Sequence, residues 1–223
     1  MPPVLLRHAF PALAPVLASV AERLRVPLTL PLQSGVALTF DDGPHPEGTP
    51  AILAILARAE VKATFFLVGE QVERRPAVAA EIVAEGHAIA LHGHRHRCQL
   101  RLTAAEIVED YRRGAAAIED ATGRSPELHR PPYGVYSGAG LEAARANQLR
   151  PLLWSKWGKD WRKFTTPERI AARATAEIAD GDVILLHDAD FYSSRNSYRR
   201  TTAALPIVIA ELKRRELGTV LAV

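Results

Sequence analysis

The stretch VALTFDDGP, residues 36–44, joins a short apolar run to two adjacent carboxylates and a glycine-proline turn. Residues 36–40 have the apolar character of a strand that is buried on both faces, as in a parallel sheet. Asp41 and Asp42 follow at the carboxyl end of that strand. Because parallel α/β folds gather their ligands at the carboxyl ends of strands, the two carboxylates mark the edge at which we expect a site.

Outward from this stretch, apolar runs alternate with amphipathic segments. The runs predict seven strands, at residues 36–40, 62–68, 88–91, 127–130, 151–155, 183–187 and 218–222. Start and stop signals predict helices from Thr49-Pro50 to about Ala59, from Pro76 to before Gly86, after the Thr103 and Glu106 capping box, from Thr166-Pro167 to about Ala179, and from about Thr201 to Arg215. Strands separated by helices lie parallel, which indicates an α/β fold, either a closed barrel or an open doubly wound sheet.

Composition is that of an ordinary globular domain. The 223 residues are 48% hydrophobic and 24% charged, and a chain of this length can bury a core as one domain. A net charge of +3 is too small to predict a nucleic-acid partner, and the single cysteine, Cys98, cannot form an internal disulfide. We therefore expect a single-domain monomer.

The first 35 residues are apolar and proline-rich, and we expect them to form a packed helical extension before a main domain at 36–223. Residues 10–21 are similar to the hydrophobic region of a secretory signal. No stretch reaches the roughly eighteen uninterrupted apolar residues of a membrane span, so we expect no transmembrane segment. The sequence leaves cytoplasmic, cell-envelope and secreted locations open.

About fifty residues after Asp42, the tract from His92 to His96 (HGHRH) adds imidazoles. Its first and last histidines come together whether the tract is extended or helical, because residues two apart share a strand face and residues four apart share a helix face. One carboxylate and two imidazoles leave coordination positions open, which is typical of catalytic metal sites. The alternative interpretation is a plain turn at Asp41 to Pro44 and a solvated polar loop at the histidines.

Three further motifs follow in order: Arg130 to Gly134 (RPPYG), a segment that ends in Asp160-Trp161, and Leu185 to His187 (LLH). On these five motifs the chain resembles the polysaccharide deacetylases of carbohydrate esterase family 4, which carry the nodulation-type chitooligosaccharide deacetylase homology domain. The resemblance covers the main domain. It implies a distorted barrel of seven or eight β/α units, and hydrolytic removal of acetyl groups from N-acetylated or O-acetylated sugars in a glycan, peptidoglycan or chitooligosaccharide.

The resemblance also assigns the first two motifs to a metal. It implies that Asp42, His92 and His96 bind a divalent ion, with zinc expected and cobalt or another divalent ion as alternatives. Two adjacent carboxylates do not stay equivalent once one binds a cation, and the resemblance makes Asp41 the general base. In one departure, Gly93 stands where the family usually has Ser or Thr, so a hydroxyl that would orient a loop or ligand is missing.

The third motif is expected to support the carboxylate of Asp41 and to stabilise the negative charge that forms during attack. By resemblance, Arg130 steadies Asp41 through a paired contact, and Pro131 stiffens the substrate-binding loop. The backbone N–H of Tyr133 then faces the oxyanion that forms during attack. The alternative is a surface arginine followed by a proline turn.

The last two motifs predict a proton donor. His187 must give a proton to the leaving amine or alcohol, and Asp160 is its natural partner because a neighbouring carboxylate favours imidazolium. Asp188 and Asp190 remain alternative partners. By resemblance, Trp161 walls the pocket and Leu185 receives the acetyl methyl group.

Three tryptophans, at 154, 157 and 161, are spaced like one helix face, and core packing explains most tryptophans. Trp157 is nevertheless a candidate for stacking on a sugar. The expected partner is thus an acetylated carbohydrate. Two alternatives remain, a hydrolase of the same superfamily that opens a cyclic amide or imide, and a carbohydrate-binding relative with weak or no catalysis.

Overall fold

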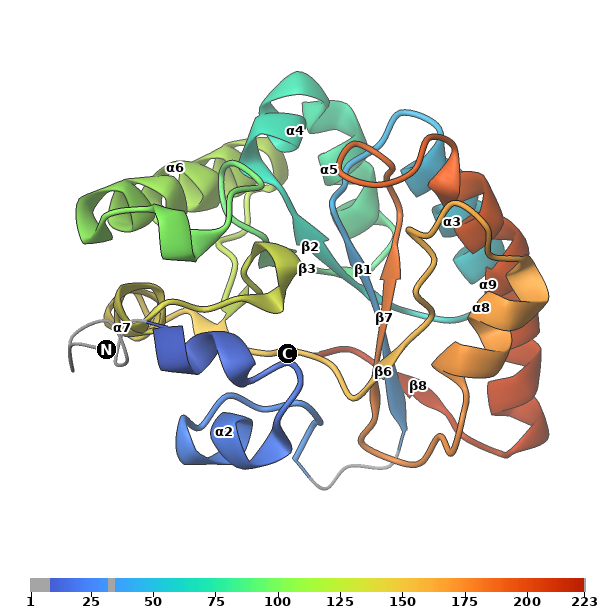
Figure 1. Ribbon diagram of the computed structural model, residues 1–223. Coiled ribbons are helices and arrows are strands. Elements are labelled where there is room, and N and C mark those ends of the chain that lie inside the picture. Colours follow the sequence, from blue (N-terminus) through green and yellow to red (C-terminus); the bar gives the residue numbers. More distant parts are fainter. Residues whose placement is uncertain (1–8, 32–34, 223) are drawn as a thin grey trace.

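The structure, a computed structural model, describes residues 9–31 and 35–222 (Figure 1). These residues contain one eight-stranded sheet. Its strands are β1 (Val36–Asp41), β2 (Thr64–Leu67), β3 (Ala88–Leu91), β4 (Leu128–His129), β5 (Arg150–Pro151), β6 (Lys156–Trp157), β7 (Val183–His187) and β8 (Thr219–Val220). Their hydrogen-bonded order is β5-β4-β3-β2-β1-β7-β6, with β8 beside β1, and every pair is parallel.

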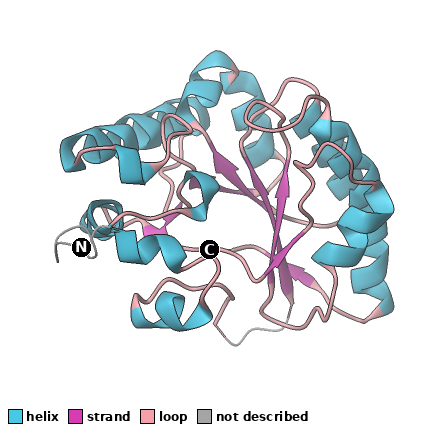
Figure 2. Cartoon of the chain, viewed as in Figure 1, coloured by secondary structure: helices cyan, strands magenta, loops and turns pink. Residues whose placement is uncertain are grey.

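Helices surround the strands on the outside, as Figure 2 shows. The α-helices are α2 (Ala18–Arg23), α3 (Gly48–Ala59), α4 (Gly69–Arg74), α5 (Pro76–Ala84), α6 (Ala104–Thr122), α7 (Gly138–Ala146), α8 (Pro167–Ala174) and α9 (Ser197–Arg214). Short 3-10 turns lie at η1 (Phe10–Leu13), η2 (Gln99–Arg101) and η3 (Pro132–Gly134). None of the helices in the described parts of the chain is both long and apolar enough to cross a membrane.

The sheet curls into a half-barrel that stays open between β5 and β6. These two strands are consecutive in sequence but stand at opposite ends of the hydrogen-bonded path. The N-terminal segment contacts the chain that connects them, because the N–H of Leu153 donates to the carbonyl of Pro27 at 2.9 Å. Thr29 also forms an antiparallel bridge with Asp182. The predicted distorted α/β barrel with parallel strands is confirmed in this open form.

Strand β1 lies at the centre of the fold and all six of its residues are buried. It pairs with β7 so that Asp41 lies in register with His187, and with β2 so that Asp41 lies in register with Phe66. The hydroxyl of Thr39 donates to the carbonyl of Ile184 at 2.7 Å, which ties the two strands together. Residues far apart in sequence therefore meet at the carboxyl edge of the sheet.

The predicted strands and helices are largely confirmed, but several boundaries are wrong. The predicted strand at 151–155 is instead the end of β5 and a link to the unpredicted β6. This apolar run crosses from one end of the sheet to the other, and its N–H groups donate to three different places: Leu152 to His129 of β4, Leu153 to Pro27, and Ser155 to Val183 of β7. Helix α8 ends at Ala174 rather than at Ala179, and α9 begins at Ser197 rather than at Thr201. Helices α4 and α7 were not predicted.

The N-terminal segment packs as expected, although it forms the separate pieces η1 and α2 rather than one helix. Ala14, Val20, Ala21 and Val26 are buried in the same core cluster as the sheet. The first eight residues of the expected extension lie outside the described residues. The boundary at residue 35 stays a prediction.

Candidate active site

A cavity of about 270 Å³ opens at the carboxyl ends of β1, β3 and β7. All five sequence motifs contribute residues to its lining, and the turn around η3 contributes its tyrosine and glycine. The lining residues are Asp41, Asp42, His92, His96, Tyr133, Gly134, Trp154, Trp157, Trp161, Leu185, His187, Tyr192 and Ser193. The positions at which the sequence predicts chemistry thus share one cavity.

Asp42, His92 and His96 form one cluster in this cavity. One carboxylate oxygen and one ring nitrogen from each histidine lie within 4.8 Å of one another. Asp42 Oδ1 lies 3.5 Å from His92 Nε2 and 3.3 Å from His96 Nε2. Two ligands about 2.1 Å from a tetrahedral zinc ion are themselves about 3.4 Å apart. The measured separations therefore fit the edges of such a coordination shell.

The polar surroundings of these side chains also fit a cation. Asp42 Oδ1 and His96 Nδ1 are buried and make no hydrogen bond to any described residue. Burial of an unpaired carboxylate oxygen is costly, and a bound cation removes that cost. A donor set of one oxygen and two nitrogens suits zinc and related divalent ions. The described residues therefore fit the divalent metal that the sequence predicts.

Two features orient the cluster. The ring of His92 contacts the carbonyl of Arg130 through Nδ1 at 2.7 Å, and since a carbonyl only accepts, Nδ1 carries the proton and Nε2 keeps its lone pair. Asp42 has a left-handed backbone with φ of 81°, an uncommon conformation for a residue with a side chain. Burial raises the pKa of Asp42, but the contacts with His92 and His96 outweigh burial and hold the pKa well below its usual range.

Asp41 faces a different partner, the fully buried guanidinium of Arg130. Arg130 Nη1 donates to Asp41 Oδ1 at 2.7 Å and to Thr39 Oγ1 at 2.9 Å. Arg130 Nε donates to the carbonyl of Leu152 at 3.1 Å, and Nη2 donates to the carbonyl of Leu153 at 2.7 Å. Burial lowers the pKa of Arg130, and Asp41 opposes that effect. The arginine is held in place from several directions, and it fixes one carboxylate oxygen of Asp41.

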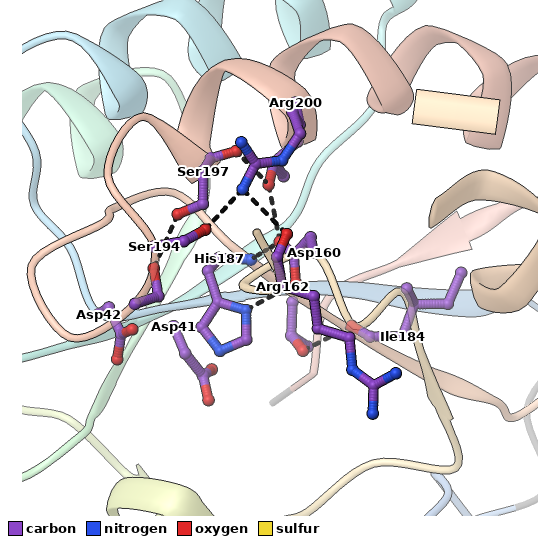
Figure 3. A network of polar contacts seen from close by, with 12 residues as sticks. Asp41, Asp42, Asp160, Arg162, Ile184, His187, Ser194, Ser197 and Arg200 are labelled. Carbon is purple, nitrogen blue, oxygen red and sulfur yellow. Dashed lines mark hydrogen bonds and ion pairs between the residues drawn. The ribbon is translucent and has the colours of Figure 1, made fainter. Parts of the chain in front are cut away.

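His187 is paired with Asp160, and Figure 3 shows its ring between Asp160 on one side and Asp41 and Asp42 on the other. Its Nδ1 lies 2.8 Å from Asp160 Oδ1, and its backbone N–H donates to Asp160 Oδ2 at 2.8 Å. Burial lowers the pKa of His187, but the charges of Asp160, Asp42 and Asp41 outweigh burial and raise it to about 10. The neighbouring carboxylates therefore favour the protonated form of the imidazole.

Asp188 and Asp190, the two alternative partners of His187, contact other residues. Asp188 accepts a hydrogen bond from the hydroxyl of Thr49. Asp190 Oδ1 lies 3.4 Å from His45 Nε2. Asp160 is thus the carboxylate that contacts the ring of His187.

The turn after β4 brings Tyr133 to the rim of the cavity. Tyr133 has a left-handed backbone, with φ of 62°, and its ring meets that of His96 edge-on at 4.6 Å. Leu185 lines the cavity from β7. Pro131 is buried in the turn and is not among the described residues that line the cavity, so contact between Pro131 and a substrate is not supported.

The family model described as polysaccharide deacetylase matches residues 31–152. This match covers more than half of the chain. The chain belongs to the polysaccharide deacetylase family. Two relatives illustrate the similarity. A peptidoglycan-N-acetylglucosamine deacetylase of Bacillus cereus is 33% identical, with 80% of this chain and 82% of that protein covered. A chitooligosaccharide deacetylase of Bradyrhizobium sp. is 34% identical, with 81% and 85% covered.

Solved structures of polysaccharide deacetylases share the fold. A crystal structure of a peptidoglycan N-acetylglucosamine deacetylase matches with a TM-score of 0.84 and 30% identity, and covers 92% of this chain and 94% of its own. A family 4 pseudoenzyme from Bacillus anthracis matches with a TM-score of 0.77 and 28% identity, and covers 86% and 65%. The family therefore includes a protein described as a pseudoenzyme.

The tryptophans of this family member do not form a helix face, because Trp157 belongs to β6. The rings instead make a continuous wall, with centroids 5.6 Å apart between Trp154 and Trp157 and 5.3 Å apart between Trp157 and Trp161. Lys159 Nζ lies 4.6 Å from the centre of the Trp157 ring. All three tryptophans line the cavity.

Tyr192 and Thr201 contribute to the site and were not predicted as site residues from the sequence. Tyr192 stacks on His96 at 4.1 Å, and its hydroxyl donates to Glu70 Oε1 at 2.9 Å and accepts from Gln71 Nε2 at 3.0 Å. Thr201 donates to Asp160 Oδ2 at 2.7 Å. Tyr192 lies near the LLH motif in sequence, but nothing in its local pattern signals a contact with the histidine tract. Thr201 was expected only as a helix start.

Proposed function

We propose that this chain is a metal-dependent deacetylase that removes acetyl groups from N-acetylated sugars of peptidoglycan or chitooligosaccharides. The observation that carries the proposal is the meeting of three groups in one cavity. The cavity is lined by the Asp42, His92 and His96 cluster, by Asp41, which is paired with Arg130, and by His187, which is paired with Asp160. The printed activities of the two relatives support the same substrate class.

In this proposal Asp42, His92 and His96 hold a divalent ion, with zinc expected. Such an ion, when bound, polarises the acetyl carbonyl and lowers the pKa of a coordinated water. Asp41 accepts a proton from the water that attacks the carbonyl. Arg130 occupies Oδ1 of that carboxylate through the 2.7 Å ion pair, which leaves Oδ2 of Asp41 to accept the proton.

The steps that follow attack by water involve Tyr133 and His187. The backbone N–H of Tyr133, at the rim of the cavity, stabilises the negative oxygen of the tetrahedral intermediate. His187 then gives its Nε2 proton to the leaving nitrogen as the carbon-nitrogen bond breaks. Acetate and a free amino sugar are the products. Asp160 holds the ring through Nδ1, which leaves Nε2 for the substrate.

Apolar and aromatic groups would position the substrate. Leu185 and Trp161 bound the cavity beside His187 and suit the acetyl methyl group. Trp157 offers a partly exposed ring for a sugar face. Pro131 would act only by stiffening the turn that carries Tyr133. The catalytic unit is proposed to span residues 36–223.

The pseudoenzyme among the similar structures raises the alternative of a sugar-binding protein without catalysis. The residues of this chain weigh against that alternative, since both proton-transfer groups and all three predicted ligands line the cavity. Asp41 is paired with Arg130, the ring of His92 with the carbonyl of Arg130, and the ring of His187 with Asp160.

The test is acetate release over a panel of acetylated glycans. Chitooligosaccharides, peptidoglycan fragments and acetylated xylan are incubated with metal-free protein, and with the same protein after zinc or cobalt is added. We expect acetate from N-acetylated substrates, loss of release with a chelator and recovery with metal. Tight sugar binding without release under any condition would favour the binding protein, and ring opening of a cyclic imide without acetate release would favour the alternative hydrolase.

A further inference from the structure

The segment between the two predicted histidine ligands is held from two directions. On one side its carbonyl groups accept hydrogen bonds from the first residues of α4, with Gly69 N–H donating to Gly93 O and Glu70 N–H donating to His94 O, both at 2.9 Å. The N–H groups of the segment point the other way, toward α6.

Asp110 of α6 receives those N–H groups. His94 N–H donates to Asp110 Oδ2 at 2.8 Å, and Arg95 N–H donates to Asp110 Oδ1 at 3.1 Å. Arg97 Nη2 reaches Oδ1 at 3.4 Å. The residue is only 8% exposed, and a buried carboxylate is stable only when such donors surround it. Each carboxylate oxygen of Asp110 therefore accepts a hydrogen bond from the backbone of the segment.

Glycines bring α6 and the segment this close. A Cβ atom on Gly93 would lie 2.8 Å from Asp110 Oδ2, and the backbone there has φ of +80°. One turn along α6, a Cβ atom on Gly114 would lie 2.9 Å from His94 N and 3.1 Å from the carbonyl carbon of Gly93. A serine or threonine at position 93 therefore has no room beside Asp110.

We propose that Asp110 is a positioning residue of the metal site and takes over the orienting task of the hydroxyl that position 93 lacks. The inference rests on the proposed function, because it assumes that His92 and His96 bind the metal. By fixing the N–H groups of His94 and Arg95, Asp110 sets the path of the segment, and thereby the approach of both ligand rings to Asp42. Preorganised ligands bind a metal more tightly than ligands that must be ordered on binding.

The test compares Asp110→Asn with Asp120→Asn. The first substitution keeps the shape of the side chain but leaves one acceptor oxygen, and the new amide group would oppose one backbone N–H. Asp120 lies exposed on the same helix, so its variant controls for the lost charge. Zinc affinity is measured by chelator competition, and ligand geometry by the absorption spectrum of the cobalt-loaded protein, both well below the unfolding temperature. We expect about tenfold weaker zinc binding and an altered cobalt spectrum for Asp110→Asn only.

The outcomes separate the two proposals. Wild-type zinc affinity and an unchanged cobalt spectrum in Asp110→Asn, with only a lower unfolding temperature, would reduce Asp110 to a structural residue and leave the deacetylase proposal intact. Wild-type protein that binds neither ion would overturn both proposals.

A second pair of variants checks the contact with Gly93. Gly93→Ser is measured in the wild type and in Asp110→Ala. Because the new Cβ meets the Asp110 carboxylate, the loss of zinc affinity should be smaller in the Asp110→Ala background. Equal losses in both backgrounds would contradict the contact.

Discussion

Asp41 and Asp42 are neighbours in sequence, but their surroundings give them separate tasks. Asp41 ends β1 and pairs with Arg130 at 2.7 Å. Asp42 follows with a left-handed backbone, which turns its carboxylate toward His92 and His96. A strand would point the two side chains to opposite faces, so the break in conformation lets both reach one cavity.

The separation predicts different effects of amide substitutions. Asp41→Asn should keep the metal, because Asp41 is outside the three-residue cluster, but should lower acetate release at least about a hundredfold, since a general base is lost. Asp42→Asn should lose metal and activity together. Metal content per chain and acetate release are measured on the same samples, and normal turnover by Asp41→Asn would refute its role as the base.

The pKa of His187 predicts the alkaline limit of activity. Its folded pKa of about 10 exceeds the ordinary value of 6.5, so the protonated form is favoured. The stability from this pairing is complete below about pH 6.5 and is lost progressively as pH rises from there through about 10. Asp160→Asn removes the main source of that increase. The alkaline limb of kcat/KM should therefore move to lower pH.

Thr201→Val serves as the matched control for this shift. It removes one hydrogen bond to Asp160 Oδ2 but leaves the carboxylate charge next to His187. Its alkaline limb should move less than that of Asp160→Asn. Identical limbs in wild type and Asp160→Asn would mean that His187 is not the acid seen in the profile.

Helix α6 begins at a capping box that is visible in the sequence, and it carries Asp110, which contacts the histidine segment. Its capping box is present as predicted, with Thr103 Oγ1 accepting from Glu106 N–H at 3.3 Å and the Glu106 carboxylate accepting from Thr103 N–H at 2.8 Å. The cap is exposed and lies more than one turn before Asp110. It should contribute to stability without contacting the metal segment.

Thr103→Ala should therefore lower the free energy of unfolding by about 1 kcal/mol, the usual cost of a lost N-cap. Urea denaturation of the metal-free protein measures the change. Zinc affinity should stay at the wild-type value, because the contacts of Asp110 remain. An unchanged unfolding midpoint would contradict the role of the cap.

Local patterns predicted the elements that carry their own signals, and missed those that depend on distant contacts. The buried run of β1 and the cap of α6 are visible in the sequence, and so are the two carboxylates and the histidine tract. Strand β6 exists only because Lys156 and Trp157 pair with β7. The contact of Tyr192 with His96, and that of Asp110 with the histidine segment, require helices and loops to be packed first.

Across the molecule, the candidate site and the contacts of the N-terminal segment lie at different places on the half-barrel. The candidate site occupies the carboxyl edge of the parallel strands, where the loops after β1, β3, β4 and β7 converge. The N-terminal segment meets the sheet at the other end, where Thr29 bridges Asp182 before β7. It also contacts the link between β5 and β6, because Pro27 accepts a hydrogen bond from Leu153, whose carbonyl accepts one from Arg130.

Anomalous diffraction at the zinc absorption edge, from crystals of the zinc-loaded protein, tests the central claim most directly. We expect one peak in the cavity, about 2.0–2.2 Å from a carboxylate oxygen of Asp42 and from Nε2 of His92 and of His96. A fully loaded crystal with its peak at other residues, or with no peak among these three side chains, would show that the metal site is not the one proposed.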